Sequence, residues 1–392
     1  MNTTERPLHV FIVATEESGD RLGAPLMREI AARAGRPVKF SGVGGDAMIA
    51  QGLTTQFPIG ELAIVGIDAV LAKLPTILRL IRETAAAVVA ARPDILVIID
   101  SPDFTHRVAK KVRKAMHGLP IVDYVSPSVW AWRPGRAKKM RAYVDHLLAL
   151  LPFEPRVHRD LGGPPCTYVG HPLAEAAATL RPNAQELARR QASPPLLLVL
   201  PGSRNGEISR LAALFGEAAH RAAERCGPLE IVVPTVPHVA ERVRAAVAEW
   251  KVPARVTFDP KEKLAAFRSA RAALAASGTV TLELAVAGVP TVLSYKISFL
   301  EEIVGHLFVG KRTIGLSNLV LGKVIMPEVL QHDATPENIV NALVPIIRDS
   351  PERQRQLDAF AELDDIMGIG KLTPSVRAAE IVLAIPDGQT PV

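Results

Sequence analysis

The sequence predicts an α/β protein built from two doubly wound units, and three features support this. Short apolar runs typical of buried strands, such as Ile95–Ile99 and Leu196–Leu200, alternate with helical segments through both halves. Several of these runs end in a turn of small or polar residues that opens a helix, as in doubly wound domains. A segment rich in Ala, Arg and Pro, residues 173–194, separates the halves as a helical linker. We expect the two units to face each other across a cleft.

The composition describes a globular protein with a mild excess of positive charge. Its 392 residues suffice for two domains, and its 48% apolar and 22% charged residues exclude a disordered chain. The net charge of +6 suits a nucleotide diphosphate or an acidic membrane surface, but is too small and dispersed to indicate nucleic acid. Neither a signal peptide pattern nor an apolar run of about 18 residues is found, so no transmembrane helix is expected. Cys166 and Cys226 lie far apart without metal-ligand spacing, which favours a cytosolic protein without disulfides.

Residues 9–14 predict the first buried strand, and a polar loop, Thr15–Asp20, follows it. A helix is expected from about Arg21 to Ala34. The loop lacks the full glycine fingerprint of dinucleotide sites, and its two glutamates would repel a diphosphate. Such a loop suits the hydroxyls of a sugar. The alternative is a capped turn, with Ser18 or Asp20 as the helix N-cap.

The next segments are a strand at residues 38–43, a glycine-rich loop with a helix to about Gln51, and an ambiguous apolar segment at residues 61–82. Apolar residues at helical spacing in this last segment favour a helix pair packed on the sheet. The alternative is a partly exposed apolar surface that meets acyl chains or a bilayer interface, with Lys73, Arg79 and Arg82 near lipid phosphates.

A polar turn follows the clear buried strand Ile95–Ile99 and brings two carboxylates to its end. Ligands bind at this edge of open α/β sheets, and buried carboxylates there are costly unless they are used or paired. Asp100 is the first residue after the strand and is the better candidate for a general base. Asp103 is expected to cap the helix that begins near Thr105.

Trp130 and Trp132 lie in the proline-bounded loop after the strand Ile121–Val125. Aromatic residues on a rigid loop commonly stack on sugars or line apolar grooves, and they equally often anchor a buried loop. Both alternatives remain open for this loop. A strand at residues 146–151 follows, and Val169–Pro172 closes the first half.

In the second half, the strand Leu196–Leu200 leads through Pro-Gly-Ser-Arg-Asn-Gly-Glu207 into a helix from about Ile208 to Cys226. Arg204 in this turn is well matched to phosphate oxygens, because an arginine fork at a helix start pairs with them directly. The following elements are expected as a strand at 230–234, a helix at 238–250, a strand at 256–258 and a helix at 261–269.

The stretch from Ala276 to Ser294 contains a second turn of this kind. The strand Ala272–Ala276 ends in Ser277, Gly278 and Thr279, a short helix runs to Ala287, and a further strand begins at Pro290. The free N–H groups and the dipole at the helix start would attract phosphate, and Glu283 would accept hydrogen bonds from a ribose diol. An ordinary strand–turn–helix unit is the alternative. Two such edges in one small sheet favour diphosphate binding.

The C-terminal part is expected to contain a helix at residues 298–309, a loop at residues 315–322, and helical structure over residues 336–384, broken near Gly368 and Gly370.

The motifs together resemble the lipid-A-disaccharide synthase family of glycosyltransferases, whose members have the two-domain GT-B fold. The resemblance runs in family order over nearly the whole chain, and its longest segment is so unusual that chance is a poor explanation for the match. The matching segments are Glu17-Ser-Gly-Asp20, Glu61-Leu-Ala-x-x-Gly66, Asp100-x-Pro-Asp-Phe104, Tyr124-Val-Ser-Pro-Ser-Val-Trp-Ala-Trp-Arg133, Leu151-Pro-Phe-Glu154, Gly170-His171, Leu200-Pro-Gly-Ser-Arg204, Ala276-Ser-Gly-Thr279 with Glu283, and Leu316-Ser-Asn-Leu319.

The resemblance implies an inverting transfer of 2,3-diacylglucosamine from UDP-2,3-diacylglucosamine to 2,3-diacylglucosamine 1-phosphate (lipid X), which yields a β-1,6-linked disaccharide phosphate and UDP. It implies two Rossmann-like domains, residues 1–172 for the acceptor and lipid and residues 173–365 for the UDP-sugar. A C-terminal helix, residues 366–392, is expected to pack back towards the first domain.

The resemblance also assigns roles to individual residues, with neither a metal nor a cofactor required. Asp100 would be the base, and Glu16 and Ser18 would belong to the catalytic site with roles left open. The UDP-binding residues would be Ser203, Arg204, Ser277, Gly278, Thr279 and Glu283. Asn318, Trp130, Trp132 and His171 would be further site residues.

The resemblance further implies a cytoplasmic protein that associates peripherally with the inner membrane of Gram-negative bacteria, and a homodimer is possible. Another UDP-sugar enzyme, a cell-wall lipid transferase or a UDP-N-acetylglucosamine 2-epimerase, remains an alternative, as does a non-catalytic nucleotide-sugar or lipid-binding module. The tryptophan loop and the apolar segment at residues 61–82 argue against the epimerase, which handles no lipid.

Overall fold

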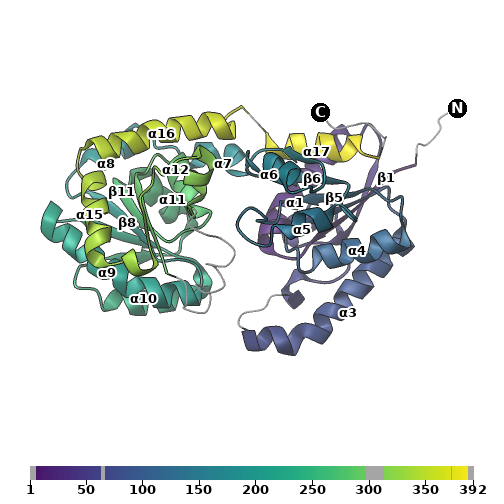
Figure 1. The fold of residues 1–392 in the computed structure, drawn as a ribbon, viewed down its shortest axis with the longest axis horizontal. Coiled ribbons are helices and arrows are strands. Elements are labelled where there is room, and N and C mark those ends of the chain that lie inside the picture. Colours follow the sequence, from purple (N-terminus) through teal and green to yellow (C-terminus); the bar gives the residue numbers. More distant parts are fainter. Residues whose placement is uncertain (1–5, 63–66, 297–312, 372, 387–392) are drawn as a thin grey trace. The chain divides into compact units, whose positions relative to one another are not determined.

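The computed structural model describes residues 6–62, 67–296, 313–371 and 373–386 (Figure 1). The chain divides into two compact units. Unit 1 comprises Met1–Pro172 together with Lys371–Val392, and unit 2 comprises Leu173–Gly370. Each unit contains one parallel sheet with helices on both faces, so the predicted two-domain α/β fold is confirmed.

Unit 1 is built on a seven-stranded sheet in the order β3-β2-β1-β4-β5-β6-β7, and all neighbouring strands are parallel. The chain builds outward from β1 to β3 and then returns to the other side of β1 with β4. The loops after β1 and β4 therefore leave the same sheet edge towards opposite faces, which opens a crevice there. The strands are β1 (Leu8–Ala14), β2 (Val38–Val43), β3 (Thr54–Thr55), β4 (Ile95–Ile99), β5 (Ile121–Tyr124), β6 (His146–Ala149) and β7 (Cys166–Tyr168).

Helices cover both faces of this sheet with separate apolar layers. On one face α1 packs beside α17, so the last described helix of the chain belongs to unit 1, and α3 lies beside α4 on the other face. The helices are α1 (Glu17–Arg33), α2 (Asp46–Ile49), α3 (Ile67–Ala91), α4 (Thr105–Ala115), α5 (Gly135–Met140), α6 (Glu154–Asp160) and α17 (Pro374–Ala384).

The segment at residues 61–82 differs from its prediction as a helix pair. A short 3-10 turn, Ile59–Leu62, precedes the single long helix α3, and residues 63–66 lie outside the described part of the chain. Leu80 and Ile81 are buried against the sheet, whereas Leu74 is 41% exposed. The helical spacing was read correctly, but periodicity alone does not show where one helix begins.

One interpretation of the polar loop after β1 made Asp20 the N-cap of α1, and this was wrong. Helix α1 already begins at Glu17, and its N-cap makes no side-chain hydrogen bond. The buried Asp20 carboxylate instead accepts hydrogen bonds from the backbone N–H groups of Gly45, Ala47 and Met48, at 2.9, 3.0 and 3.0 Å. Asp20 therefore caps α2 across the β1–β2 edge and shapes the glycine loop.

Unit 2 has a six-stranded parallel sheet in the order β10-β9-β8-β11-β12-β13. Its strand order reverses between β8 and β11, so a second crevice is expected at their carboxyl ends. The strands are β8 (Leu196–Leu200), β9 (Glu230–Pro234), β10 (Arg255–Thr257), β11 (Ala272–Ala275), β12 (Thr291–Tyr295) and β13 (Glu328–Leu330).

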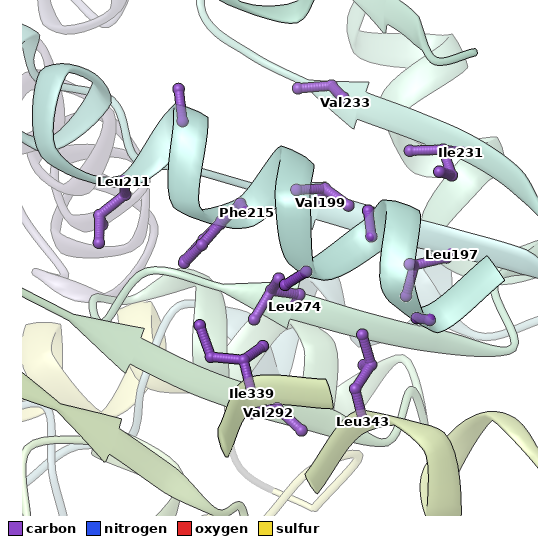
Figure 2. Packing of buried hydrophobic residues seen from close by; sticks show 14 of the residues in the cluster. Leu197, Val199, Leu211, Phe215, Ile231, Val233, Leu274, Val292, Ile339 and Leu343 are labelled. Carbon is purple, nitrogen blue, oxygen red and sulfur yellow. The ribbon is translucent and has the colours of Figure 1, made fainter. Parts of the chain in front are cut away.

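One apolar cluster holds α9 and α15 on the same face of this sheet (Figure 2). Phe215 of α9 and Leu343 of α15 belong to this cluster together with Val199 and Leu274 of the two central strands, and all four side chains are fully buried. The helices of unit 2 are α7 (Leu173–Leu180), α8 (Ala184–Gln191), α9 (Asn205–Cys226), α10 (Ala240–Ala248), α11 (Pro260–Ser269), α12 (Val280–Val286), α14 (Leu316–Leu321), α15 (Pro336–Ile347) and α16 (Pro351–Met367).

Three expectations for unit 2 need comment. The predicted loop at residues 315–322 contains the helix α14, which ends at Gly322 in the left-handed conformation. The helical stretch at residues 336–384 is also broken before α16, where Ser350 accepts a hydrogen bond from the N–H of Arg353 and Pro351 begins the helix. The helix expected at residues 298–309 lies outside the described residues.

Where the chain is described, no helix is both long and apolar enough to span a bilayer.

Candidate active site

Asp100 lies at the reversal point of the sheet in unit 1, directly after β4. Ala14 at the end of β1 pairs with Ile99 at the end of β4, so the loops after these strands start side by side. Asp100 and Ser101 both have positive φ angles, 52° and 47°, which non-glycine residues rarely adopt. The Asp100 N–H donates to the carbonyl of Tyr124 at 3.0 Å, and the Thr105 hydroxyl donates to the carbonyl of Asp100 at 2.6 Å. These two contacts hold Asp100 in an unusual backbone conformation, as is common at functional sites.

Glu16, at the end of the β1–α1 loop, belongs to the same site. The Ser101 hydroxyl donates a hydrogen bond to its carboxylate at 2.8 Å, which brings the two loops together. Burial raises the pKa of Asp100, and the charges of Glu16 and Asp123 raise it further, while the Ser101 N–H and His106 oppose this. A carboxylate whose pKa lies above its usual value is better suited to accept a proton near neutral pH.

Two other polar residues of this edge are exposed. Ser18 lies in the first turn of α1 with its side chain in solvent, beside the Glu16 loop. The prediction that Asp103 caps α4 was wrong, because the N-cap is Phe104 and no side chain caps this helix. The Asp103 carboxylate instead lies 3.4 Å from the guanidinium of Arg136 in an exposed ion pair.

The two tryptophans of the loop after β5 have different environments. Trp130 is half-buried, its indole N–H donates to Glu154 at 3.3 Å, and its ring packs edge-on against Phe153 with 5.5 Å between centroids. Burial raises the pKa of Glu154 to about 7. Trp130 is therefore a loop anchor.

Trp132 is 45% exposed. The guanidinium carbons of Arg133 and Arg136 lie 4.2 and 5.7 Å from the centroid of its ring, within the range of cation–π contact. The ring of Trp132 is thus partly covered by arginine and partly exposed to solvent. His171, also in unit 1, follows β7, and burial lowers its pKa to about 4, so the ring is neutral at physiological pH.

In unit 2 the loop after β8 is organised by Glu207, which the sequence analysis did not single out. This buried carboxylate accepts hydrogen bonds from the backbone N–H groups of Ser203 and Arg204, at 3.0 and 3.2 Å, and from the hydroxyl of Tyr295 at 3.2 Å. These two amides are therefore already satisfied within the loop. The Arg204 side chain stays 80% exposed, with one 3.4 Å ion pair to Glu207. The sequence could have indicated this role, because Glu207 lies three residues after Arg204 at a helix start, which is the spacing of a capping box.

Gly202 allows Glu207 to lie under this loop. Its φ is 113°, and a Cβ built there would lie 2.3 Å from Oε2 of Glu207. We expect Gly202→Ala to displace the loop, to weaken UDP binding at least about tenfold, and to destabilise unit 2 by about 2–4 kcal/mol, from backbone strain and overpacking. Titration calorimetry and thermal unfolding measure both effects.

Gly206→Ala is the matched control. This residue lies in the first turn of α9, and a Cβ there would meet nothing closer than 3.4 Å, a guanidinium nitrogen of Arg210. The control should bind UDP normally. Equal UDP affinity in both variants would contradict the role given to this loop.

The turn before α12 leaves the adjacent strand at the same sheet edge. Leu200 of β8 pairs with Ala275 of β11, so the Arg204 loop and the turn Ser277–Thr279 start side by side. The Ser277 hydroxyl donates to the carbonyl of Ile314 at 3.0 Å. No side chain caps α12, and among the described residues no hydrogen bond is recorded for the N–H groups of residues 278–280.

Two predicted ligand contacts of unit 2 have partners within the protein. Glu283 forms an ion pair with Lys263, with 2.9 Å between Nζ and Oε2. The buried amide of Asn318 donates to the carbonyl of Met326 and to Glu328, both at 2.8 Å, and accepts from two backbone N–H groups. We expect Asn318 to fix the segment after α14 and to act on a ligand only through it.

No group of three or more His, Cys, Asp or Glu side chains that could hold a metal ion is found in the described parts of the chain.

Comparisons with known proteins agree with one another. The sequence model of the lipid-A-disaccharide synthetase family matches residues 10–381. The chain is 55% identical over 383 residues to the lipid-A-disaccharide synthase of Rhodopseudomonas palustris (strain ATCC BAA-98 / CGA009), covering 98% of each chain. It is 57% identical to that of Nitrobacter hamburgensis, covering 95% of this chain and 94% of the relative.

Solved structures with low sequence identity share the fold. MurG from Acinetobacter baumannii is 16% identical, with a TM-score of 0.56 and coverage of 98% of this chain and 100% of MurG. UDP-GlcNAc 2-epimerase from Neisseria meningitidis is 12% identical, with a TM-score of 0.56 and coverage of 96% and 98%. These similarities indicate the two-domain GT-B architecture.

Proposed function

Since this chain belongs to the lipid-A-disaccharide synthase family and is thus a glycosyltransferase of lipid A biosynthesis, we propose that it joins two acylated glucosamines. The donor is UDP-2,3-diacylglucosamine and the acceptor is 2,3-diacylglucosamine 1-phosphate. The product is their β-1,6-linked disaccharide 1-phosphate, and UDP is released. The observation that carries the site assignment is the position of Asp100 and Arg204, each in the loop after a central strand at the reversal point of its sheet.

The reaction inverts the anomeric centre, because the donor is α-linked and the product is β-linked. One displacement suffices: the acceptor O6 forms a bond to C1 of the donor sugar while the bond from C1 to the UDP oxygen breaks. The O6 proton passes to the carboxylate of Asp100, and the electron pair leaves with UDP. The raised pKa of Asp100 brings its basicity closer to the working pH, which favours this transfer.

The leaving diphosphate is stabilised from unit 2. The exposed guanidinium of Arg204 pairs with its oxygens, and the N–H groups at the start of α12 add hydrogen bonds where negative charge develops. Ser203 and Ser277 belong to the two turns that form this edge. Glu283 accepts from the ribose, with Lys263 holding its carboxylate in place.

The lipid parts of both substrates require apolar contacts in unit 1. Leu74 of α3 and Trp132 are exposed apolar side chains there, and Arg133 and Arg136 flank Trp132 with positive charge. We assign the acyl chains or the inner-membrane surface to these residues, with peripheral association from the cytoplasmic side. Glu16 and Ser18 would bind hydroxyls of the acceptor sugar. Formation of a homodimer stays a prediction.

Acceptor dependence tests the proposal. The purified protein is given UDP-2,3-diacylglucosamine with or without 2,3-diacylglucosamine 1-phosphate, and released UDP is measured. Rapid release only with the acceptor supports transfer. Conversion of UDP-N-acetylglucosamine to its 2-epimer, or UDP binding without acceptor-dependent release, would overturn it.

A further inference from the structure

A buried polar cluster lies near Asp100, and none of its residues takes part in the bond-breaking or proton-transfer steps proposed above. It consists of Asp123 of β5, His106 of α4 and Tyr143 after α5, and each is at most 5% exposed. Nε2 of His106 lies 3.0 Å from Oδ2 of Asp123, and Nδ1 lies 3.1 Å from the Tyr143 hydroxyl. The imidazole is thus held at both nitrogens.

This cluster is joined to Asp100 from two sides. Asp123 pairs with Ile98 across β4 and β5, and the next residue of β5, Tyr124, accepts the Asp100 N–H. On the other side Thr105, whose hydroxyl holds the Asp100 carbonyl, directly precedes His106. A displacement of the cluster would therefore reach the strained backbone at Asp100 through short connections.

Burial of such a cluster is costly, so its presence in the core needs a reason. A buried carboxyl loses its hydration, and an apolar set of similar volume would serve stability as well or better. Burial raises the pKa of Asp123, which its contact with His106 opposes, and no hydrogen bond is recorded for its buried Oδ1. The charges of Asp123 and His106 act on Asp100 in opposite directions.

We propose that Asp123, His106 and Tyr143 form a positioning unit that holds the backbone of Asp100 and balances the charge around its carboxylate. The proposal rests on the function assigned to Asp100 above. Asp123 is hydrogen-bonded to Nε2 of His106, and Tyr143 fixes the ring of His106 through Nδ1.

Other titratable and charged groups face the same region, and they stay unchanged in all the variants described below. Glu16 acts on Asp100 from the β1–α1 loop. The ammonium of Lys110 lies 4.9 Å from the centroid of the Tyr143 ring, and Arg136 acts on both Tyr143 and Lys110. The thiol of Cys166 on β7 stays protonated, because burial and the charges of Glu154 and Asp123 raise its pKa.

The test is the pH dependence of kcat/KM in Asp123→Asn and His106→Asn. A base acts only when deprotonated, so activity falls as pH drops through the pKa of Asp100. Without the Asp123 charge the pKa of Asp100 falls. The acidic limb of the kcat/KM profile, where activity falls with decreasing pH, should then move to lower pH by about one unit. Without His106 the pKa rises, and the limb should move up by a similar amount. Loss of packing alone would not shift the two variants in opposite directions.

Tyr143→Phe removes only a hydroxyl and serves if a charge variant fails to fold. It should move the acidic limb to higher pH by less than His106→Asn does. The imidazole is still present and still bonded to Asp123, and it loses only its contact with the Tyr143 hydroxyl. His146→Asn is the matched control, since this buried histidine of the same sheet contacts Thr167 at 2.9 Å and should leave the limb in place.

Two failures are distinguishable. Full turnover in Asp100→Asn would overturn the base role proposed for Asp100, on which the positioning unit rests. If Asp100→Asn abolishes turnover while the limb stays in place in the cluster variants, or moves in the same direction in all of them, the positioning unit is refuted.

Discussion

Asp100→Asn should lower kcat by at least about a hundredfold and leave the affinity for UDP unchanged. General base catalysis contributes about 10²–10⁴-fold, and an amide of the same shape cannot take the proton. UDP affinity is expected to persist because the proposed diphosphate contacts come from unit 2. Unfolding temperature should not fall, because burial and the charge of Glu16 already disfavour the ionised form of Asp100. Steady-state kinetics with both substrates and calorimetric titration with UDP measure the two effects.

Asp103→Asn is the matched control for this prediction. Its carboxylate lies three residues further on in the same loop, is exposed, and makes only a weak ion pair with Arg136. The control should retain kcat within about twofold, as is usual for an exposed substitution away from the reacting atoms. A similar loss in both variants would mean that the loop, and not the Asp100 carboxylate, is required.

Arg204→Ala should weaken UDP binding by about 30- to 150-fold. A charge-assisted hydrogen-bonded pair contributes about 2–3 kcal/mol, which corresponds to this range of affinities. Arg204→Lys should restore only part of the affinity, because an ammonium cannot bind two phosphate oxygens in one plane. Unfolding should be unchanged, since the side chain is 80% exposed and its ion pair with Glu207 is long.

Arg244→Ala controls for the loss of one positive charge from unit 2. Its guanidinium forms an ion pair with Glu241 on the exposed surface of α10. Measured by the same titration, it should bind UDP as the wild type does. Wild-type affinity in Arg204→Ala would remove Arg204 from the diphosphate site.

The positions of Asp100 and Arg204 at sheet edges were predictable from the sequence. Asp100 directly follows the apolar run Ile95–Ile99, and Arg204 lies four residues after the run Leu196–Leu200. Both runs are fully buried in the structure. In a parallel sheet the end of such a run lies at the ligand-binding edge, so a local pattern gives the location of the residue.

Contacts between segments far apart in the chain were not predictable in this way. Asp20 caps a helix 26 residues later, and Tyr295 reaches Glu207 from another strand. Local propensity favours a cap for the nearest helix, and only the packed sheet shows which helix start lies closest. The tryptophan loop illustrates a further limit, because its two rings have different environments: Trp130 anchors the loop, whereas Trp132 is exposed and its contact with a sugar or an apolar chain stays a prediction.

The product formed from the two proposed substrates tests the central claim most directly. The protein is incubated with UDP-2,3-diacylglucosamine and 2,3-diacylglucosamine 1-phosphate in the presence of a chelator, and the products are identified by mass spectrometry and by the NMR coupling of the new anomeric proton. We expect a β-1,6-linked disaccharide 1-phosphate and one equivalent of UDP. An α-linked product, or no disaccharide despite UDP binding, would contradict a single inverting displacement with Asp100 as the base.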